Sequence, residues 1–361
     1  RELAELGAVY DSGALSNRNI IHNGAFQVAQ RGTSATGVTD SAFNTVDRFL
    51  YAEGSGGGSA GFTISQSTEA PDGFNNSFKF EVTTTDTLTG GENCLIRTRL
   101  EGQDMQRFKF GSSSAESMTV SFFVRASLTG TYGLQVMIGP SSQRTAMQSY
   151  TVNSANTWEY KTITFAGSTD YTIPNDNARG FDLNFMLDSG PDDLVAPYAF
   201  TSVTAFRAPT GQVNFVRTSG ATFHLTGIQV EVGTEATPFE HRSFGDELIR
   251  CQRYYKRIST TSSSQHLAFA YGLNYTSTIF LGGLNFSPEM RTVPSFSTNV
   301  FNDSSFVVVR NDNTSTVSAM SISGTGASVR LNATSSSLTA GDGAYLQLND
   351  NGSYVDFDAE L

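Results

Sequence analysis

Apolar and polar residues alternate along most of this chain, which is the pattern of half-buried β-strands. In residues 118–126, for example, one face carries Met118, Val120, Phe122 and Val124. The same two-residue period recurs in residues 62–67, 78–84, 95–100, 134–138, 158–165, 181–187 and 223–232. Turns rich in Gly, Asn, Asp and Ser separate these segments, with no crossover helices between them. The pattern therefore predicts an all-β sandwich of antiparallel strands and excludes a doubly wound α/β fold.

The strand at 223–232 has one irregularity. Phe223 and Leu225 share a face with Ile228, Val230 and Val232 only if the alternation slips by one position at Gly227. An extra, unpaired residue at a glycine produces such a slip, so we expect a β-bulge there.

One convincing helix follows this strand and is predicted over residues 243–259. Its apolar stripe has spacings of four, three, four and three residues and consists of Phe244, Leu248, Cys251, Tyr255 and Ile258. Ser243 and Asp246 have the spacing of a capping box, which marks the start of a helix. We expect the stripe to pack between domains or between copies of the chain.

Strand patterns resume beyond the helix and predict a second, smaller β-sandwich domain over residues 260–361. Its expected strands cover residues 267–275, 279–286, 306–310, 317–322, 328–332, 344–348 and 354–357. The expected organisation is a lead-in at 1–16, a first domain at 17–242, the linking helix at 243–259 and this second domain. A domain of about 100 residues buries too little surface alone to be very stable. We therefore expect a symmetric oligomer, most simply a homotrimer.

Three stretches carry a family resemblance, namely residues 17–34 (NRNIIHNGAFQVAQRGTS), 46–49 (VDRF) and 223–257, the bulged strand and following helix. Together they resemble a recurring module of tail-fibre and related virion appendage proteins of bacteriophages. The two ends of the region 17–258 match such modules closely, whereas its interior matches them only in general character. The resemblance implies a jelly-roll domain similar to carbohydrate-binding modules, and it marks no ligand contacts.

The function implied is non-enzymatic attachment of a virion to a glycan on the host cell surface. The chain starts with Arg1 and is expected to be part of a longer protein, joined to other virion proteins through a missing N-terminal part. Two alternatives stay open: a structural collar, baseplate or capsid fibre without receptor binding, and a tailspike that degrades polysaccharide.

The composition limits the classes of partner that we expect for this chain. The net charge is -11 and the pI about 4.8, whereas nucleic-acid binding depends on clustered Lys and Arg, so we expect no nucleic-acid partner. No run of 18 apolar residues occurs, and we expect no membrane insertion. Cys94 and Cys251 stand alone, without the spacing of a zinc site or a disulfide framework, and are expected to be buried free thiols.

No catalytic motif is convincing. Residues 56–61 match G-x-G-x-x-G and residues 57–61 match G-x-S-x-G, but a strand pattern follows where either motif needs a helix. The four histidines show no metal-binding spacing, and the carboxylates form no linear glycosidase motif. We therefore expect no catalytic residue.

Aromatic side chains are the candidates for sugar contact, because such modules usually stack a ring on the sugar face. Trp158 and Tyr160 share one face of a strand, and Tyr271 and Tyr275 share another in the second domain. Burial is the competing role for Trp158, the single tryptophan, and subunit interfaces compete for the tyrosines. We expect no cofactor. Similar jelly rolls often hold a structural calcium ion where the first and last strands meet, with Asn23 and Glu231 on those strands here.

Overall fold

A computed structural model describes residues 17–54, 58–140, 143–262, 266–311 and 313–361. The lead-in predicted at 1–16, and residues 55–57, which include the start of the two glycine motifs, lie outside these ranges. The chain divides into two compact units, residues 1–247 with Leu361 and residues 248–360. Within the described ranges, no helix is long and apolar enough to cross a membrane.

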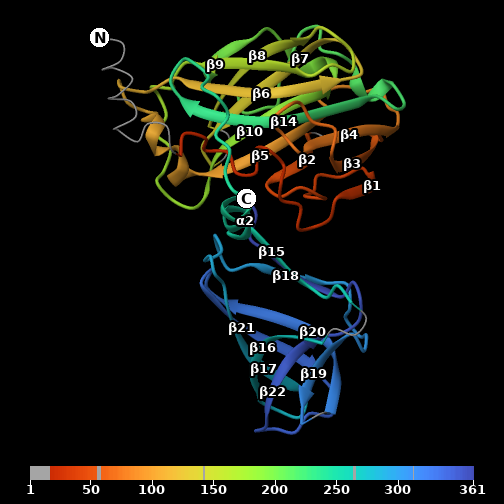
Figure 1. Ribbon diagram of the computed structural model, residues 1–361. Helices are drawn as coiled ribbons and strands as arrows, with labels where there is room; N and C mark the ends of the chain where they lie inside the picture. Colours follow the sequence, from red (N-terminus) through yellow and green to blue (C-terminus); the bar gives the residue numbers. More distant parts are fainter. Residues whose placement is uncertain (1–16, 55–57, 141–142, 263–265, 312) are drawn as a thin grey trace. The chain divides into compact units, whose positions relative to one another are not determined.

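The first unit is a sandwich of two antiparallel six-stranded sheets (Figure 1). Sheet A has the order β1 (Ser34–Val38), β3 (Gly61–Ser67), β4 (Ser77–Thr84), β14 (Thr222–Val232), β6 (Met118–Ala126) and β9 (Glu159–Phe165). Sheet B has the order β12 (Tyr198–Thr201), β8 (Arg144–Val152), β7 (Gly130–Ile138), β10 (Arg179–Ser189), β5 (Asn93–Glu101) and β2 (Phe49–Gly54). The all-β fold class is confirmed.

The core of this unit lies between the sheets and is filled by the inward residues of the alternating pattern. Phe122 of sheet A and Phe185 of sheet B, both fully buried, meet edge to face with ring centroids 5.0 Å apart. Burying one such side chain contributes about 1.5–3 kcal/mol. Because the inward positions are committed to this core, only the alternate residues are free to form a functional surface.

Short elements connect the strands of the first unit. They are the 3-10 helices η1 (Gly102–Phe108), η2 (Pro191–Asp193) and η3 (Phe215–Arg217) and the parallel pair β11 (Leu194–Val195) and β13 (Ala208–Pro209). Gly227 has a φ of +61° and lies at a register shift between Thr226 and Gln229, so the predicted bulge is confirmed. The predicted strand at Phe62 is also confirmed: β3 begins at Gly61, the last residue of the two enzyme motifs, where either motif needed a helix.

The second unit is all-β, as expected, but its main sheet closes on itself (Figure 1). The barrel runs β16 (Leu267–Asn274), β17 (Ile279–Asn285), β21 (Ser328–Ser335), β20 (Asn313–Gly324), β19 (Phe306–Arg310) and β22 (Gly343–Leu348). A separate three-stranded sheet contains β15 (Tyr255–Ser259), β23 (Tyr354–Asp358) and β18 (Ser295–Thr298). Closure removes the exposed edge strands that an open sheet of this size would have. The alternating pattern in the sequence does not indicate whether a sheet closes.

The linking helix is shorter than predicted. Helix α2 covers Phe244–Gln252, and Tyr255 and Ile258, expected on its stripe, lie instead in β15. The positions of these residues fit both a helical period and strand alternation. Pairing with β23, in which Tyr255 lies opposite Asp358, makes the segment a strand. The start is as predicted, because the Ser243 hydroxyl accepts the Asp246 amide at 3.2 Å and donates to its carboxylate at 2.7 Å.

The stripe is buried unevenly. Phe244 is 55% exposed, Leu248 is half-buried, and Cys251 and Tyr255 are buried. The predicted role of the stripe in packing between domains or copies stays a prediction. Both cysteines are buried and lie outside any disulfide, as expected.

Candidate functional site

The outer face of sheet A carries a group of neighbouring aromatic rings. Phe123 points outward because Phe122 and Val124, on either side of it, point into the core, and its cross-strand partner on β9 is Tyr160. We call this surface the aromatic terrace. It consists of Phe74, Phe123, Tyr160, Phe239 and His241.

The rings of the terrace are in direct contact. The centroids of Tyr160 and Phe123 are 5.0 Å apart, and those of Phe123 and Phe74 are 5.4 Å apart. Phe74 in turn lies 5.0 Å from Phe239 and 5.2 Å from His241. Tyr160 is 49% exposed and His241 is exposed, whereas the three phenylalanines are half-buried. The phenylalanines thus form a packed base that presents Tyr160 and His241 to solvent.

The bulge in β14 makes this packing possible. A Cβ atom at Gly227 would lie 2.7 Å from Cζ of Phe74 and 3.1 Å from Cδ2 of Phe123. The two rings therefore occupy the space that a side chain would fill, and the positive φ of this residue also favours glycine. The sequence revealed the bulge, but not that two rings close over it.

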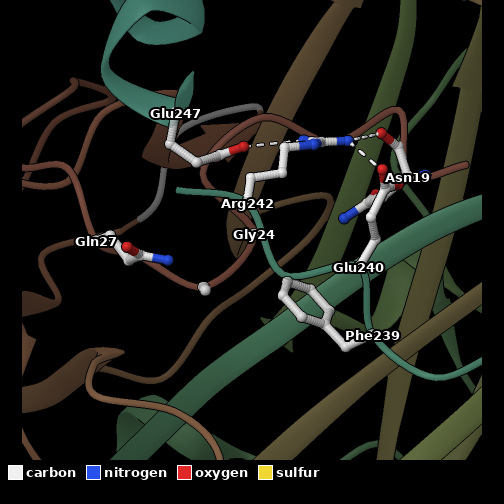
Figure 2. Close-up of a pocket in the computed structure, with 8 residues that line it drawn as sticks. Asn19, Gly24, Gln27, Phe239, Glu240, Arg242 and Glu247 are labelled. Carbon is white, nitrogen blue, oxygen red and sulfur yellow. Dashed lines mark hydrogen bonds and ion pairs between the residues drawn. The ribbon is translucent and has the colours of Figure 1, made fainter. Parts of the chain in front are cut away.

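The segment that supplies Phe239 and His241 is anchored to the start of the domain (Figure 2). The Arg242 guanidinium donates to the carbonyls of Ile21 and Asn19 and to the Glu247 carboxylate, at 2.9 Å for Ile21 and Glu247. The Glu240 carboxylate accepts the amides of Asn17 and Asn19 at 2.6 and 2.8 Å. These contacts join two of the sequence stretches that carry the family resemblance.

A small cavity lies beside this anchor, lined by Asn19, Gly24, Phe239, Arg242 and Glu247 among others (Figure 2). Its volume of about 10 Å³ suffices for one water molecule at most. The anchor is therefore a structural joint, and the exposed terrace is the surface available to a ligand.

Trp158 and Tyr160 share the outer face of sheet A, as predicted. Trp158 is half-buried, with its ring edge-on to His224 at a centroid distance of 5.9 Å. It lies two residues before Tyr160, at the margin of the terrace. The sequence did not identify Phe74, Phe123, Phe239 and His241 as part of this surface, because they come from separate strands and loops.

Tyr271 and Tyr275 belong to the second unit and are 67% and 63% exposed. Tyr271 lies on β16, and its ring centroid is 5.9 Å from that of Tyr345 on β22. Tyr275 follows the end of β16. Both tyrosines are therefore on the surface of the barrel unit, as expected for residues that contact a ligand or another chain.

The outer face of sheet B is covered. Leu50, Leu95 and Met186 on this face pack beneath side chains from the 194–208 segment, including Leu194 and Phe206. The long connection after β10 thus covers this sheet. Among the described residues of the two outer faces, the exposed aromatic ring of Tyr160 lies on sheet A.

Ser77, His224 and Glu69 meet on sheet A in an arrangement that resembles a nucleophilic triad. The Ser77 hydroxyl is 3.3 Å from Nδ1 of His224, whose Nε2 is 3.4 Å from the Glu69 carboxylate. However, Ser77 and His224 are fully buried, and the Ser77 hydroxyl donates to the Glu69 carbonyl at 2.6 Å. Burial, together with nearby Arg125 and Lys79, lowers the pKa of His224 to about 3. A nucleophile needs access and a base that accepts its proton, so this cluster is structural.

The two residues considered for calcium are already occupied by protein donors. The side-chain oxygen of Asn23 accepts the Val28 amide at 3.0 Å, and its nitrogen donates to the Val28 and Asp47 carbonyls. The Glu231 carboxylate accepts the Thr237 amide and hydroxyl at 2.8 and 2.7 Å. The described ranges contain no group of three or more His, Cys, Asp or Glu placed to hold a metal ion. Asn23 and Glu231 therefore do not fit a calcium site.

No family model matches the sequence, and no curated protein matches it. A carbohydrate-binding module of family 4 is similar over 59% of this chain and 99% of its own, at 14% identity and a TM-score of 0.31. A family 11 module from Clostridium thermocellum, solved with a β-1,3-1,4-mixed-linked tetrasaccharide, is similar over 58% of this chain and 99% of its own, at 14% identity and a TM-score of 0.28.

The enzymatically active domain of tailspike protein 4 from bacteriophage CBA120 is similar over 60% of this chain, at 10% identity and a TM-score of 0.29. Only 21% of that tailspike chain is covered. The likeness to carbohydrate-binding modules and to a phage tailspike is thus distant and structural. The function of this chain has to be argued from its own surface.

Proposed function

We propose that this chain is a non-enzymatic glycan-binding protein that uses the aromatic terrace of sheet A to hold a sugar. The observation that carries the proposal is the exposed ring of Tyr160, supported from below by Phe123 on the neighbouring strand. An exposed ring on a rigid β-sheet offers an apolar face to the C–H groups of a sugar. Little conformational entropy is lost on binding, because the ring is already held in place.

Polar groups suited to sugar hydroxyls surround the ring. Thr162 lies two residues beyond Tyr160 on the same face of β9 and is exposed. His241 provides ring nitrogens at the other end of the terrace, and the phenol of Tyr160 can both donate and accept. The surface is open, so it suits weak contacts to an extended glycan. Several weak sites in one oligomer would add up to firm attachment through avidity.

The place proposed for this activity is the tail fibre of a bacteriophage, where the protein attaches the virion to a host surface glycan. The support is the resemblance carried by residues 17–34, 46–49 and 223–257. We propose a homotrimer, joined to other virion proteins through a preceding N-terminal part. The rivals are a structural appendage without receptor binding and a polysaccharide-degrading tailspike, and the test below includes the outcome expected of each.

The test measures retention of the labelled, purified chain on candidate host cells with and without periodate oxidation of their surface sugars. We expect saturable retention that periodate abolishes and that Tyr160→Ala reduces by about tenfold or more. Tyr160→Phe keeps the ring and should retain most of the binding, and equal melting temperatures would show that both variants are folded.

Other outcomes select the rivals. Absence of retention on every susceptible host, with tight binding to particles that lack the protein, would identify a structural appendage. Release of reducing ends from host polysaccharide would identify a tailspike enzyme. Periodate-sensitive retention that Tyr160→Ala leaves unchanged would keep the glycan-binding function but remove the terrace as its site.

A further inference from the structure

A row of five residues crosses the outer surface of the barrel in the second unit. In order, the row runs Tyr345 on β22, Tyr271 on β16, Gly283 on β17, Arg330 on β21 and Ser323 on β20, each directly opposite the next. Residues directly opposite each other on neighbouring strands project from the same face of the sheet. The row therefore places an aromatic ring and a guanidinium on the same surface, on either side of a glycine.

Gly283 leaves open space between Tyr271 and Arg330. A Cβ atom built on this glycine would have no other atom within 4 Å. The Tyr271 ring contacts Tyr345 on the opposite side, with centroids 5.9 Å apart at an angle of 44°. The strands that carry Tyr271 and Arg330 are separated by two interstrand spacings, or about 10 Å. This is the width of a gap that one sugar ring could enter.

A shallow depression of about 550 Å³ opens on the same surface. Its lining includes Gly283, Arg330 and Ser323 from the row, together with the polar side chains of Asn285 and Ser328. The volume is within the range of small-molecule sites. Asn and Ser side chains supply donors and acceptors for hydroxyl groups, so the depression combines the groups that a sugar ligand needs.

Arg330 is the one charged residue in this lining. It is exposed, and its guanidinium forms no ion pair or hydrogen bond with the residues that the structure describes. A planar guanidinium binds a carboxylate through two parallel hydrogen bonds. The overall charge of -11 acts weakly here, because at physiological salt the field of distant exposed charges is screened beyond about 8 Å. The local charge at the depression thus favours an anionic ligand.

We propose that the groove formed by Tyr271, Gly283 and Arg330 binds an acidic saccharide, one whose sugar ring carries a carboxylate. Tyr271 contacts the apolar face of the ring, the gap over Gly283 accommodates it, and Arg330 pairs with its carboxylate. Hexuronic acids and sialic acids share this chemistry. This site belongs to a different unit from the aromatic terrace, and it stands or falls independently of the glycan binding proposed there.

The test measures binding of the full chain to four soluble probes by calorimetry or ligand-observed NMR. Two probes are acidic, a linear hexuronic acid tetrasaccharide and a sialylated trisaccharide, and two are their neutral, carboxyl-reduced counterparts. We expect at least one acidic probe to bind saturably and at least about tenfold more tightly than its neutral counterpart. The acidic probe that binds identifies the class of sugar.

The variants are designed to remove the site without unfolding the barrel. Gly283→Val fills the gap at a position with free space and without a positive φ, so melting should stay unchanged or rise. We expect this variant and Arg330→Gln each to weaken acidic binding at least about tenfold, and Arg330→Lys to weaken it less. Tyr160→Ala, in the other unit, reports any contribution of the aromatic terrace to the binding of these probes.

Three results would overturn the proposal. They are the absence of saturable binding of both acidic probes, equal affinity for acidic and neutral probes, and wild-type affinity in folded Gly283→Val or Arg330→Gln. If Tyr160→Ala abolished acidic binding while the barrel variants retained it, the acidic sugar would belong to the terrace instead.

Discussion

Arg257 and Asp356 form a bidentate ion pair between β15 and β23, in which Nε donates to Oδ1 at 2.7 Å and Nη2 donates to Oδ2 at 2.8 Å. The two residues are cross-strand partners, and the Arg257 guanidinium also lies 3.8 Å from the ring centroid of Tyr354. The pair fixes the register of β15, the segment in which strand pairing replaced the predicted helix.

Loss of this pair should destabilise the second unit. We predict that Arg257→Met lowers its free energy of unfolding by about 1–3 kcal/mol, because Asp356 is then left mostly buried without its donor. Amide hydrogen exchange of β15 and β23 should become faster by the factor that corresponds to this loss of free energy. Arg257→Lys keeps the positive charge but cannot form both hydrogen bonds, so its stability should lie between those of the wild type and Arg257→Met. Unchanged exchange in Arg257→Met would mean that packing alone holds β15.

His224 should make the first unit sensitive to acid. Its pKa is lowered in the folded state to about 3, while the unfolded side chain titrates near 6.5. Between these values the unfolded state binds the extra proton, so stability rises with pH and is lost as the pH falls from 6.5 towards 3. A full proton difference corresponds to about 1.4 kcal/mol per pH unit.

The comparison of His224→Gln with the wild type isolates this contribution. Asp188 acts in the opposite direction, because burial raises its pKa to about 6, and the difference between the two proteins cancels its effect. We predict a shallower loss of stability below pH 6.5 in His224→Gln, measured by denaturation followed through Trp158 fluorescence. His266→Gln lies in the second unit and serves as the control for a substitution outside the first unit. Parallel pH profiles for His224→Gln and the wild type would refute this assignment.

Gly227→Ala should damage both the fold and the terrace. The added methyl group would clash with Phe74 and Phe123, and the alanine would have to keep a positive φ. Together these two effects should cost about 2–3 kcal/mol of unfolding free energy. Gly220→Ala is the matched control, since its φ is +74° but no atom lies within 4 Å of the new methyl group. It should cost about 1 kcal/mol. Equal melting temperatures for the two variants would show that the rings move aside freely.

Arg242 should be needed to keep the two ends of the first domain together. Arg242→Gln leaves the Glu247 carboxylate buried without its cation and should cost about 3 kcal/mol of unfolding free energy. The double variant Arg242→Gln/Glu247→Gln removes the unpaired charge as well and should recover part of this loss. Denaturation followed by Trp158 fluorescence measures both, and a double variant no more stable than the single one would argue against the charge explanation.

The proposed trimer leads to a prediction for helix α2. If the stripe packs between domains or copies as predicted, Leu248→Asp should reduce the oligomer mass measured in solution and lower the melting temperature. Gly245→Asp adds the same charge in the first turn, off the stripe, where the helix N-terminus tolerates it, and serves as the control. Unchanged mass and melting in Leu248→Asp would remove the stripe from any such interface.

The local features of this protein were readable from its sequence. Strand positions follow from a two-residue period, the bulge at Gly227 from a slip in that period, and the helix start from Ser243 and Asp246, because each depends on residues within a few positions of one another. The end of the helix was not readable in this way. Residues 255–258 satisfy both periods, and the partner that decides, β23, is about a hundred residues away in the chain.

The candidate sites were decided by tertiary structure. Tyr160 and Tyr271 could be chosen from the sequence as surface aromatics, but their neighbours could not. Phe74 reaches the terrace from a loop and packs over Gly227, and Phe239 reaches it from the segment after β14. Arg330 lies across Gly283 from Tyr271 only because β16, β17 and β21 pair in one particular register. Periodicity determines which face of a strand a residue occupies, whereas register and closure, set by the packing of the whole chain, determine what lies beside it.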